Sequence, residues 1–375
     1  MKKVIEINKA RLGSLDALRG FDMFWIMGGD AIVKAIAVIS GATFWQAAAA
    51  QMEHPDWNGF HFFDLIFPLF LFIAGVATPY SIGKELEKGK TRNELLRRIV
   101  RRSLILVLIG FITANHPDGH FILKPLGEYR FASVLGRIGL AYMLANIIYL
   151  YSKEKTQMIW FAALIIGYWL LLKFTSAPGF PPGDLSMEGN FASYIDRSVM
   201  PGALYLKIHD PEGLVSTIPA VGTGLLGIIT GTFLKKQSVS GNKKSLGMLV
   251  TGALFLLLAR WWDLDFPINK NLWSSSFVLY AGGFSLILLA AFYYIIDVLG
   301  YKKWAFFFRV IGMNSILIYI SGLFINWEYT TKALFNWLLQ LSHEPYTALI
   351  YAACMVTAKF LLLYLLYKKK IFLRV

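Results

Sequence analysis

The sequence predicts an all-α membrane protein, a polytopic bundle of about ten transmembrane helices with both termini in the cytoplasm. Of its 375 residues, 56% are hydrophobic and only 16% are charged, whereas about 25% of residues are charged in soluble domains. Apolar runs of about 20 residues recur along the chain, which is long enough to cross a hydrocarbon core about 30 Å thick. Basic residues gather in alternate connections. We therefore expect residues 1–375 to form a single transmembrane domain.

The predicted spans are the apolar runs that lie between stretches of charged or polar residues. In chain order they are 14–38, 62–83, 97–115, 133–151, 156–174, 214–234, 244–262, 273–298, 303–324 and 345–368. The first run contains Asp16, Arg19 and Asp22, which the apolar part of a cleavable signal peptide would not tolerate. We therefore expect this run to be a span.

The net charge of +14 is compatible with a nucleic-acid partner, but its distribution argues against one. Basic residues crowd Lys84–Arg102, Lys235–Lys244 and Lys368–Arg374, and these segments alternate with connections that hold few basic residues. That alternation is typical of the positive-inside rule and places the basic loops in the cytoplasm. The outer loops are then about 39–61, 116–132, 175–213, 263–272 and 325–344. We expect the first and third of these loops to contribute to the active site or to cap it.

Small residues inside the predicted spans indicate helix packing. Gly222–Gly227 matches the GxGxxG pattern of dinucleotide-binding proteins, but that motif needs a preceding strand and a βαβ unit. Inside a span, these glycines together with Gly231 predict a close approach of two helices. The single cysteine, Cys354, excludes an internal disulfide and is expected to pack in the bundle.

The first span is rich in ionisable residues, which are costly inside a bilayer and usually face a cavity or one another. Asp16 and Arg19 are three residues apart, so they share a helix face and can pair near the cytoplasmic end. They form either a structural ion pair or a polar site for a charged ligand from the cytosol. Asp30 and Lys34 have the spacing of a second pair at the outer end, and Asp30 is a candidate partner of His54.

His54 is the candidate with the clearest chemistry. It lies in the polar outer loop Glu53–Gly59, shortly before Asp64 opens the second span. A neutral imidazole can take a proton from an amine or hydroxyl and return it, or it can accept an acyl group covalently. Loop histidines are also commonly solvated and inert. Further histidines lie on or near the outer face, so spacing alone does not select His54: they are His61, His116, His120, His209 and His343.

A metal site is not expected, because no two of these histidines have ligand spacing on a helix. Four arginines, which lie at the inner end of the third span, are Arg97, Arg98, Arg101 and Arg102. They either set the orientation of the span or bind an anionic cofactor, since guanidinium groups match phosphate oxygens. Two polar clusters, Asn269–Trp273 and Gly312–Ser315, border or lie within spans, where amide and hydroxyl groups need partners or line a cavity.

Several of these stretches together resemble a known family. They are Ser14–Gly20, His54 with Trp57–Gly59, Asp64–Leu65, Tyr194–Arg197, Asp210–Gly213, Asn269–Trp273, Gly312–Leu317 and Tyr367–Phe372. In this order they are similar to bacterial members of the heparan-α-glucosaminide N-acetyltransferase family of transmembrane acyltransferases. The stretches around His54 and at Asn269–Trp273 are specific to the family, whereas the Leu-Asp-x-x-Arg-Gly element is shared more widely. The resemblance covers essentially the whole chain.

The resemblance implies that acetyl-CoA on the cytosolic side supplies an acetyl group. The acceptor is then the amine of a terminal glucosamine on the far side, and the active-site histidine corresponds to His54. In the family this residue acts either as a covalent acetyl carrier or as a general base in a ternary complex. Asp30 stands where lysosomal members have an asparagine, which leaves its role open.

We therefore predict a multi-pass acetyltransferase of the bacterial inner membrane. His54 is expected to be catalytic, with Asp30 or Asp64 orienting it. The residues expected to bind acetyl-CoA are Asp16, Arg19, Arg101, Arg102, Arg137, Asn314 and Ser315. The residues expected to bind the amino sugar or glycan acceptor are Trp57, Asn58, Asn269 and Lys270. A homodimer is compatible with the sequence.

Two other functions remain open on the sequence. An O-acyltransferase acting on a glycan of the cell envelope would use the same histidine, and mild alkali would cleave its ester product but not an amide. A transporter for an envelope precursor would also carry intramembrane charges, but it would show hydropathy symmetry between two halves, which we do not find. The identity of the acceptor is not fixed by the sequence.

Overall fold

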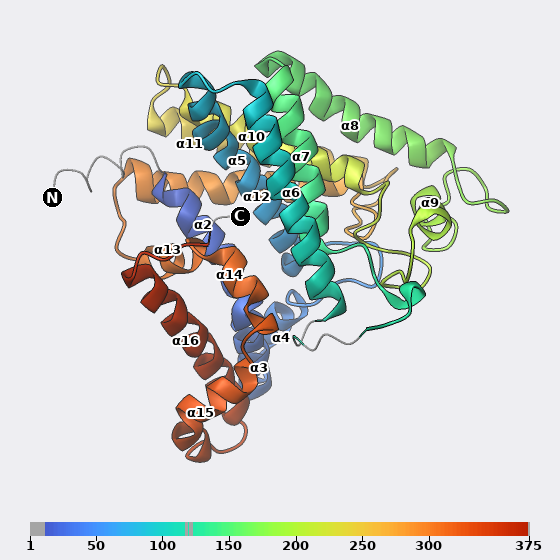
Figure 1. Cartoon of the computed structure of the whole chain (residues 1–375). Coiled ribbons are helices and arrows are strands. Elements are labelled where there is room, and N and C mark those ends of the chain that lie inside the picture. The colour runs from blue at the N-terminus through green and yellow to red at the C-terminus, as the bar shows by residue number, and fades with distance from the viewer. Residues whose placement is uncertain (1–11, 117–118, 120–122, 374–375) are drawn as a thin grey trace.

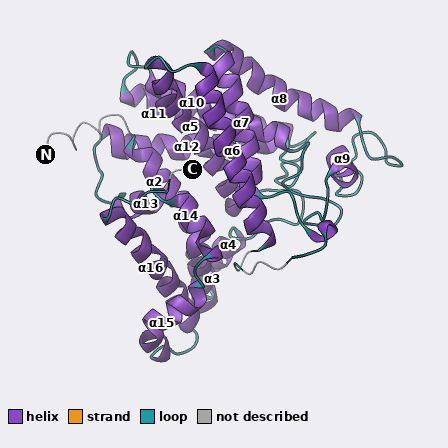
Figure 2. Cartoon of the chain, viewed as in Figure 1, coloured by secondary structure: helices purple, strands orange, loops and turns teal. Residues whose placement is uncertain are grey.

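The computed structural model describes residues 12–116, 119 and 123–373, and the regular elements within them are helices (Figures 1 and 2). The nearest approach to a strand in this part of the chain is an isolated bridge between Arg130 and Gly202. His120, Arg374 and the basic residues before position 12 lie outside the described residues. The predicted all-α class is confirmed.

In the described part of the chain, eight helices or continuous helix runs are long and apolar enough to cross a membrane. Three are composite, namely α2–η2–α3 (Gly13–Ser40), η3–α5 (Phe62–Glu87) and α12–η5 (Ser275–Val298). The others are α7 (Val134–Tyr151), α8 (Glu154–Phe174), α10 (Thr217–Lys235), α11 (Gly241–Trp262) and α16 (Thr347–Lys368). These helices coincide with eight of the predicted spans.

The other two predicted spans are also helical, but each departs from a simple apolar rod. The run 303–324 becomes α13 (Phe306–Gly312) and α14–η6 (Ser315–Leu323), which meet at an angle of 67°. The run 97–115 lies in α6 (Arg92–Asn115), whose first turns carry the arginine cluster. Its apolar part is therefore shorter than a full span. Buried Leu95, Ile99 and Leu106 pack it into the bundle.

The glycines of α10 allow it to touch α5 (Ile66–Glu87) along its length, as predicted. A Cβ atom at Gly227 would overlap the carbonyl oxygen of Phe72, and one at Gly231 would overlap that of Val76. A similar contact joins the first span to the bent pair, since a Cβ at Gly312 would overlap the carbonyl oxygen of Asp16. Close backbone contact of this kind holds helices together where lipid offers no hydrophobic driving force.

The first span is interrupted by a π-turn, η2 (Trp25–Gly29), between α2 (Gly13–Phe24) and α3 (Asp30–Ser40). Gly28 has a φ of 132°, a backbone conformation that side chains rarely allow. The carbonyl of Met27, in this turn, accepts a hydrogen bond of 2.9 Å from Lys359 Nζ on α16. The side chain of Lys359 therefore satisfies a backbone group that the turn exposes.

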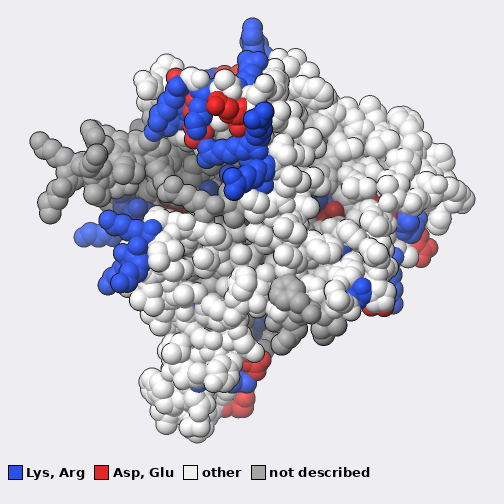
Figure 3. All heavy atoms as spheres, in the orientation of Figure 1, with Lys and Arg blue, Asp and Glu red and all other residues white. Residues whose placement is uncertain are grey.

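Helices also form in the connections that were predicted to lie outside, namely α4 (Thr43–Ala50), α9 (Phe191–Val199) and α15 (Trp327–Gln340). Figure 3 shows Lys and Arg side chains gathered at the top and left of the molecule, with a broad surface of uncharged residues beyond them. We call the helix ends that carry Lys84–Arg102, Lys235–Lys244 and Lys368–Lys370 the basic face. The ends that carry His54 and α9 form the opposite face.

Candidate active site

His54 is held by a buried carboxylate at the opposite face. Its Nδ1 lies 2.6 Å from Oδ1 of Asp64, and Asp64 is fully buried at the start of the second span. The other carboxylate oxygen of Asp64 accepts the backbone N–H of His61 at 2.9 Å. With Nδ1–H donated to Asp64, the Nε2 lone pair of His54 is free to act as a base or nucleophile. The His54 side chain is 48% exposed, so substrates can reach it.

Lys270 stands beside this pair. Its Nζ is 3.2 Å from Nδ1 and 3.0 Å from Nε2 of His54, and 3.4 Å from Oδ1 of Asp64. The ring lone pair lies in the plane of the imidazole, so a hydrogen bond to Nε2 would leave Nδ1 clearly farther away. The nearly equal distances instead place the ammonium over the face of the ring. Burial lowers the pKa of Lys270, and the neighbouring Asp64 carboxylate offsets only part of that effect.

Hydrogen bonds between the loop that carries His54 and the loop that carries Lys270 hold these two side chains next to each other. Asn269 Nδ2 donates to Asn58 Oδ1 at 3.0 Å, and the backbone N–H of Gly59 donates to the carbonyl of Ile268 at 2.8 Å. Trp57 Nε1 donates to the carbonyl of Leu185 at 2.9 Å, which ties the same loop to the segment before α9. Of the four predicted acceptor-binding residues, Lys270 alone contacts the histidine among the described contacts. The other three brace the loops.

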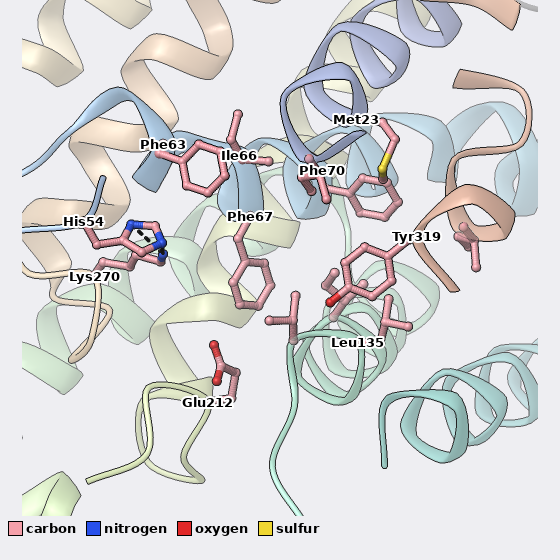
Figure 4. A pocket seen from close by; sticks show the side chains of 14 residues that line it. Met23, His54, Phe63, Ile66, Phe67, Phe70, Leu135, Glu212, Lys270 and Tyr319 are labelled. Atoms are coloured by element: carbon pink, nitrogen blue, oxygen red, sulfur yellow. Dashed lines mark hydrogen bonds between the residues drawn. The ribbon is translucent and has the colours of Figure 1, made fainter. Parts of the chain in front are cut away.

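His54 opens into a cavity of about 230 Å³, which we call the His54 cavity. Its polar lining consists of His54, Lys270, Glu212 and Tyr319, as Figure 4 shows. The remaining walls are apolar and come from several helices, namely Met23, Ile26, Phe63, Ile66, Phe67, Phe70, Val134, Leu135, Ile138 and Ile316. In this view Glu212 points into the cavity across from His54 and Lys270. Neither Glu212 nor Tyr319 was predicted as a site residue.

Glu212 is positioned by a buried ion-pair cluster. The guanidinium of Arg130 donates to both oxygens of Asp210, from Nε at 2.8 Å and from Nη2 at 2.6 Å, and it also binds Glu212. Burial raises the pKa of Asp210, but the hydrogen bonds and charge of Arg130, together with the backbone N–H groups of Glu212 and Tyr205, leave that pKa below its usual range. Arg137 supports the same segment by donating to the Gly213 carbonyl at 3.2 Å and to Ser216.

A second cavity, of about 420 Å³, lies toward the basic face, and we call it the basic cavity. Four cationic side chains line it, namely Arg19, Lys84, Arg98 and Arg102. Arg102 donates to Tyr142 Oη at 3.2 Å and stacks over the same ring, 4.7 Å from its centroid. Asp16 and Ser315 also line it, and Asp16 pairs with Arg19 at 3.7 Å, as predicted. Guanidinium groups in such a cavity suit a ligand with phosphate groups.

The two cavities share part of their lining inside the bundle. Phe70 of α5 and Ile316 of α14 line both of them. Phe70 belongs to the helix that Asp64 opens, and Ile316 follows the bend between α13 and α14. Two apolar side chains thus lie between a cavity lined by cationic groups and one lined by His54, Lys270 and the carboxylate of Glu212.

Three predicted cofactor residues lie away from the lining of the basic cavity. Arg101 is exposed on the other side of α6, beside Leu104 and Leu108. Arg137 is buried near the opposite face, with its guanidinium 5.1 Å above the ring of Trp273. The side chain of Asn314 binds the backbone near the C-terminus. Arg98, which the sequence analysis placed in the arginine cluster as a candidate for binding an anionic cofactor, lines the basic cavity one helical turn from Arg102.

Asp30, the other predicted partner of His54, is not among the residues that contact His54 in the described part of the chain. It lies near Lys359 instead. Its predicted partner Lys34 has Nζ 3.6 Å from Glu53 Oε1. Asp64 is thus the carboxylate placed to orient the histidine.

The other described histidines have different surroundings. His209 is fully buried, with Nδ1 2.8 Å from Ser193 Oγ and Nε2 3.2 Å from the Asn271 carbonyl. Burial lowers the pKa of His209 to about 4, so it is neutral and structural. His343 is exposed, and His116 is buried at the end of α6. Among the described residues, no group of three or more His, Cys, Asp or Glu side chains is arranged to hold a metal ion.

Comparison with known proteins agrees with the motifs. A family profile described as "Domain of unknown function (DUF5009)" matches residues 11–191. Heparan-alpha-glucosaminide N-acetyltransferase from Homo sapiens is 28% identical over an alignment that covers 97% of this chain and 60% of the human protein. The protein of the same name from Mus musculus is 29% identical, with 98% and 62% covered. The chain thus spans about 60% of the length of these relatives. The resemblance is confirmed: this polytopic helical chain is similar in sequence, over nearly its whole length, to the heparan-alpha-glucosaminide N-acetyltransferases.

Proposed function

We propose that this chain is a transmembrane acetyltransferase that moves acetyl from cytosolic acetyl-CoA to the amine of a glucosamine-type sugar on the far side of the membrane. The observation that carries the proposal is that the basic cavity and the His54 cavity lie next to each other and share Phe70 and Ile316 as wall residues. Cations suit the phosphates of the donor, and a histidine–carboxylate pair suits acyl transfer. The relatives whose names describe N-acetyltransferases support the same class of reaction.

The donor is assigned to the basic cavity. Arg19, Lys84, Arg98 and Arg102 would bind its phosphates, and the apolar part of the cavity near Phe70 would receive its arm. Arg102 fits this role, since its Nε is buried without a hydrogen-bond partner among the described residues. The thioester would then reach the His54 cavity past Phe70 and Ile316.

His54 is assigned the acyl-transfer step, with Asp64 holding its ring. As a base, Nε2 takes a proton from the acceptor amine while the amine nitrogen bonds to the thioester carbonyl carbon. The carbon–sulfur bond then breaks, and the CoA thiolate leaves and takes up a proton. As a nucleophile, Nε2 itself bonds to that carbon, the carbon–sulfur bond breaks and CoA leaves as its thiolate; the amine nitrogen then bonds to the acetyl carbon, the carbon–Nε2 bond breaks, and the proton lost by the amine passes to the freed Nε2. Both routes use the same nitrogen.

We assign to Lys270 the role of stabilising the negative charge that develops on the carbonyl oxygen of the thioester. Its ammonium lies within 3.0 Å of His54 Nε2, beside the position that the reacting carbon must occupy. A fixed cation in a mostly apolar cavity stabilises such a charge more strongly than water does. Glu212, which points into the same cavity, is placed to bind a polar group of the acceptor.

The orientation follows from the charges. The basic face would lie in the cytoplasm and His54 on the periplasmic side of a bacterial inner membrane. We treat residues 1–375 as one transmembrane domain, with loops 39–61 and 175–213 capping the His54 cavity.

The test is acetyl transfer by purified protein in nanodiscs, with radiolabelled acetyl-CoA and glucosamine as substrates. The wild type is expected to label the sugar amine, and His54→Ala is expected to lose that activity. His61→Ala is the matched control, because His61 contacts the Glu53 carbonyl from the same loop and does not line the His54 cavity.

The outcomes separate the competing functions. Equal transfer by the wild type and His54→Ala, with both proteins folded, would overturn the assignment of His54. A labelled product that mild alkali cleaves would identify an ester and favour O-acylation. Uptake of acceptor into vesicles without any acetyl transfer would favour a transporter.

A further inference from the structure

The chain reverses direction after its last span and returns to the basic cavity. The end of α16 is closed by hydrogen bonds from Lys369 N to the Leu365 carbonyl and from Ile371 N to the Leu366 carbonyl. Lys370 has a φ of 58°, the left-handed conformation that commonly ends a helix. The next residues, Ile371–Leu373, then run beside the bend between α13 and α14. Phe372 and Leu373 line the basic cavity.

Asn314 holds this segment at two points. Its Nδ2 donates to the carbonyl of Ile371 at 3.0 Å, and its Oδ1 accepts the backbone N–H of Leu373 at 2.9 Å. The two bonds fix the backbone on either side of Phe372. Asn314 is only 2% exposed and lies in the break of the bent helix pair. Its side chain does not cap α14, so both of its polar atoms are available to the segment. The carboxamide therefore satisfies one backbone carbonyl and one backbone N–H of the segment, as a neighbouring strand would.

We propose that Ile371–Leu373 forms a wall of the donor site and that Asn314 is the positioning residue that holds this wall in place. This inference rests on the proposed function, which assigns acetyl-CoA to the basic cavity. Phe372 and Leu373 supply an apolar surface in a cavity whose polar groups are mostly cationic. That pairing fits a ligand that joins phosphates to an apolar arm or an aromatic base, as CoA does. Asn314 then acts on the donor through the segment, without touching the thioester.

Cysteine labelling tests the wall directly, because Cys354 is the single cysteine in the sequence and is buried. In a Cys354→Ala background, Phe372→Cys is treated with a maleimide in the presence and absence of CoA. With CoA at about ten times its dissociation constant, about nine in ten sites are occupied, so labelling is expected to slow about tenfold. Lys88→Cys, exposed at the basic face and outside the cavity lining, is expected to react at the same rate with and without CoA.

The positioning role has its own readout. Asn314→Ala is expected to raise KM for acetyl-CoA about three- to tenfold with little change in kcat, since two hydrogen bonds to the segment are lost. Leu373→Pro removes the N–H that Asn314 accepts and leaves the bundle untouched, so it should raise KM in the same direction. It also keeps the test informative if Asn314→Ala fails to fold.

CoA binding, measured separately with radiolabelled CoA, separates this inference from the proposed function. If CoA binds but neither slows the labelling of Phe372→Cys nor depends on Asn314, the wall is refuted and the proposed function stands. If CoA does not bind at all, the proposed function itself fails.

Discussion

A buried carboxylate, Asp196, next to the segment Asp210–Gly213 makes the stability of the protein depend on pH in a calculable way. Asp196 on α9 is fully buried, and its Oδ1 accepts the backbone N–H of Leu214 at 2.9 Å. Its Oδ2 is buried without a hydrogen-bond partner among the described residues. Burial raises the pKa of Asp196 to about 6. The segment it supports, Asp210–Gly213, carries Glu212 into the His54 cavity.

Because burial raises the pKa of Asp196, this residue stabilises the fold more at low pH than at high pH. The carboxyl is harder to ionise in the folded protein than in the unfolded chain, where its pKa is about 3.9. Its contribution to stability is therefore complete below pH 4 and is lost as pH rises through about 6. The pKa of Asp196 differs by about two between the folded and unfolded states, and at about 1.36 kcal/mol for each the loss in the free energy of unfolding is about 3 kcal/mol.

His209 has the opposite dependence, and the two effects nearly cancel. Burial lowers its pKa to about 4, against about 6.5 in the unfolded chain. Its contribution is complete above pH 6.5 and is lost as pH falls, again by about 3 kcal/mol. From these two residues the wild type should therefore show little net change in stability between pH 4 and 6.5.

Asp196→Asn is expected to reveal the pH-dependent contribution of Asp196, which His209 offsets in the wild type. The amide keeps the acceptor for Leu214 N–H but cannot ionise, so the variant should gain up to about 3 kcal/mol over the wild type at pH 8. Any cost of burying the amide does not depend on pH, so it changes the stability of the variant by the same amount at low and at high pH. The assay is the apparent Tm of purified protein in detergent from pH 4.5 to 8. Asp56→Asn, an exposed carboxylate in the His54 loop, is the control.

A Tm difference between Asp196→Asn and the wild type that does not change with pH would refute this reasoning. It would mean that the carboxyl titrates alike in the folded and unfolded states. The same difference appearing in Asp56→Asn would point to net charge rather than burial.

Three further predictions concern the cavities and the packing of the bundle. Phe70→Trp should enlarge one of the two side chains that stand between the cavities and lower kcat for acetyl transfer, measured in steady state, by about tenfold or more. Arg102→Ala should raise KM for acetyl-CoA about tenfold, as expected for one charge-assisted hydrogen bond, whereas exposed Arg101→Ala should leave KM unchanged in the same steady-state assay. Gly227→Val should cost about 1–3 kcal/mol through overpacking against α5, read as a lower Tm, and Gly127→Val, which has open space around its Cα, should not.

Features that depend on the order of residues along one helix could be predicted from the sequence. The apolar runs gave the spans, because a hydrocarbon core requires a helix of fixed length. The pairing of Asp16 with Arg19 follows from helical periodicity, and the close packing of α10 on α5 follows from the glycines. The arginine cluster was also visible in the sequence, and two of its members, Arg98 and Arg102, one turn apart, line the basic cavity.

Features that depend on the folding of loops could not be predicted. Asp30 and Asp64 both lie toward the outer ends of their spans, and only the path of the loop between them decides which one reaches His54. Glu212 enters the cavity because Arg130 and Arg137 hold its segment, and those contacts join residues about 80 positions apart. Asn314 binds a segment 57 residues later in the chain. No local pattern encodes these contacts.

The central claim is that acetyl crosses the membrane through the two cavities, and oriented proteoliposomes test it most directly. Radiolabelled acetyl-CoA is supplied at the basic face, and glucosamine is enclosed with the face that carries His54. The account predicts labelled N-acetyl product in the glucosamine compartment for the wild type and none for His54→Ala. Labelled product that forms only when both substrates share one compartment would contradict it.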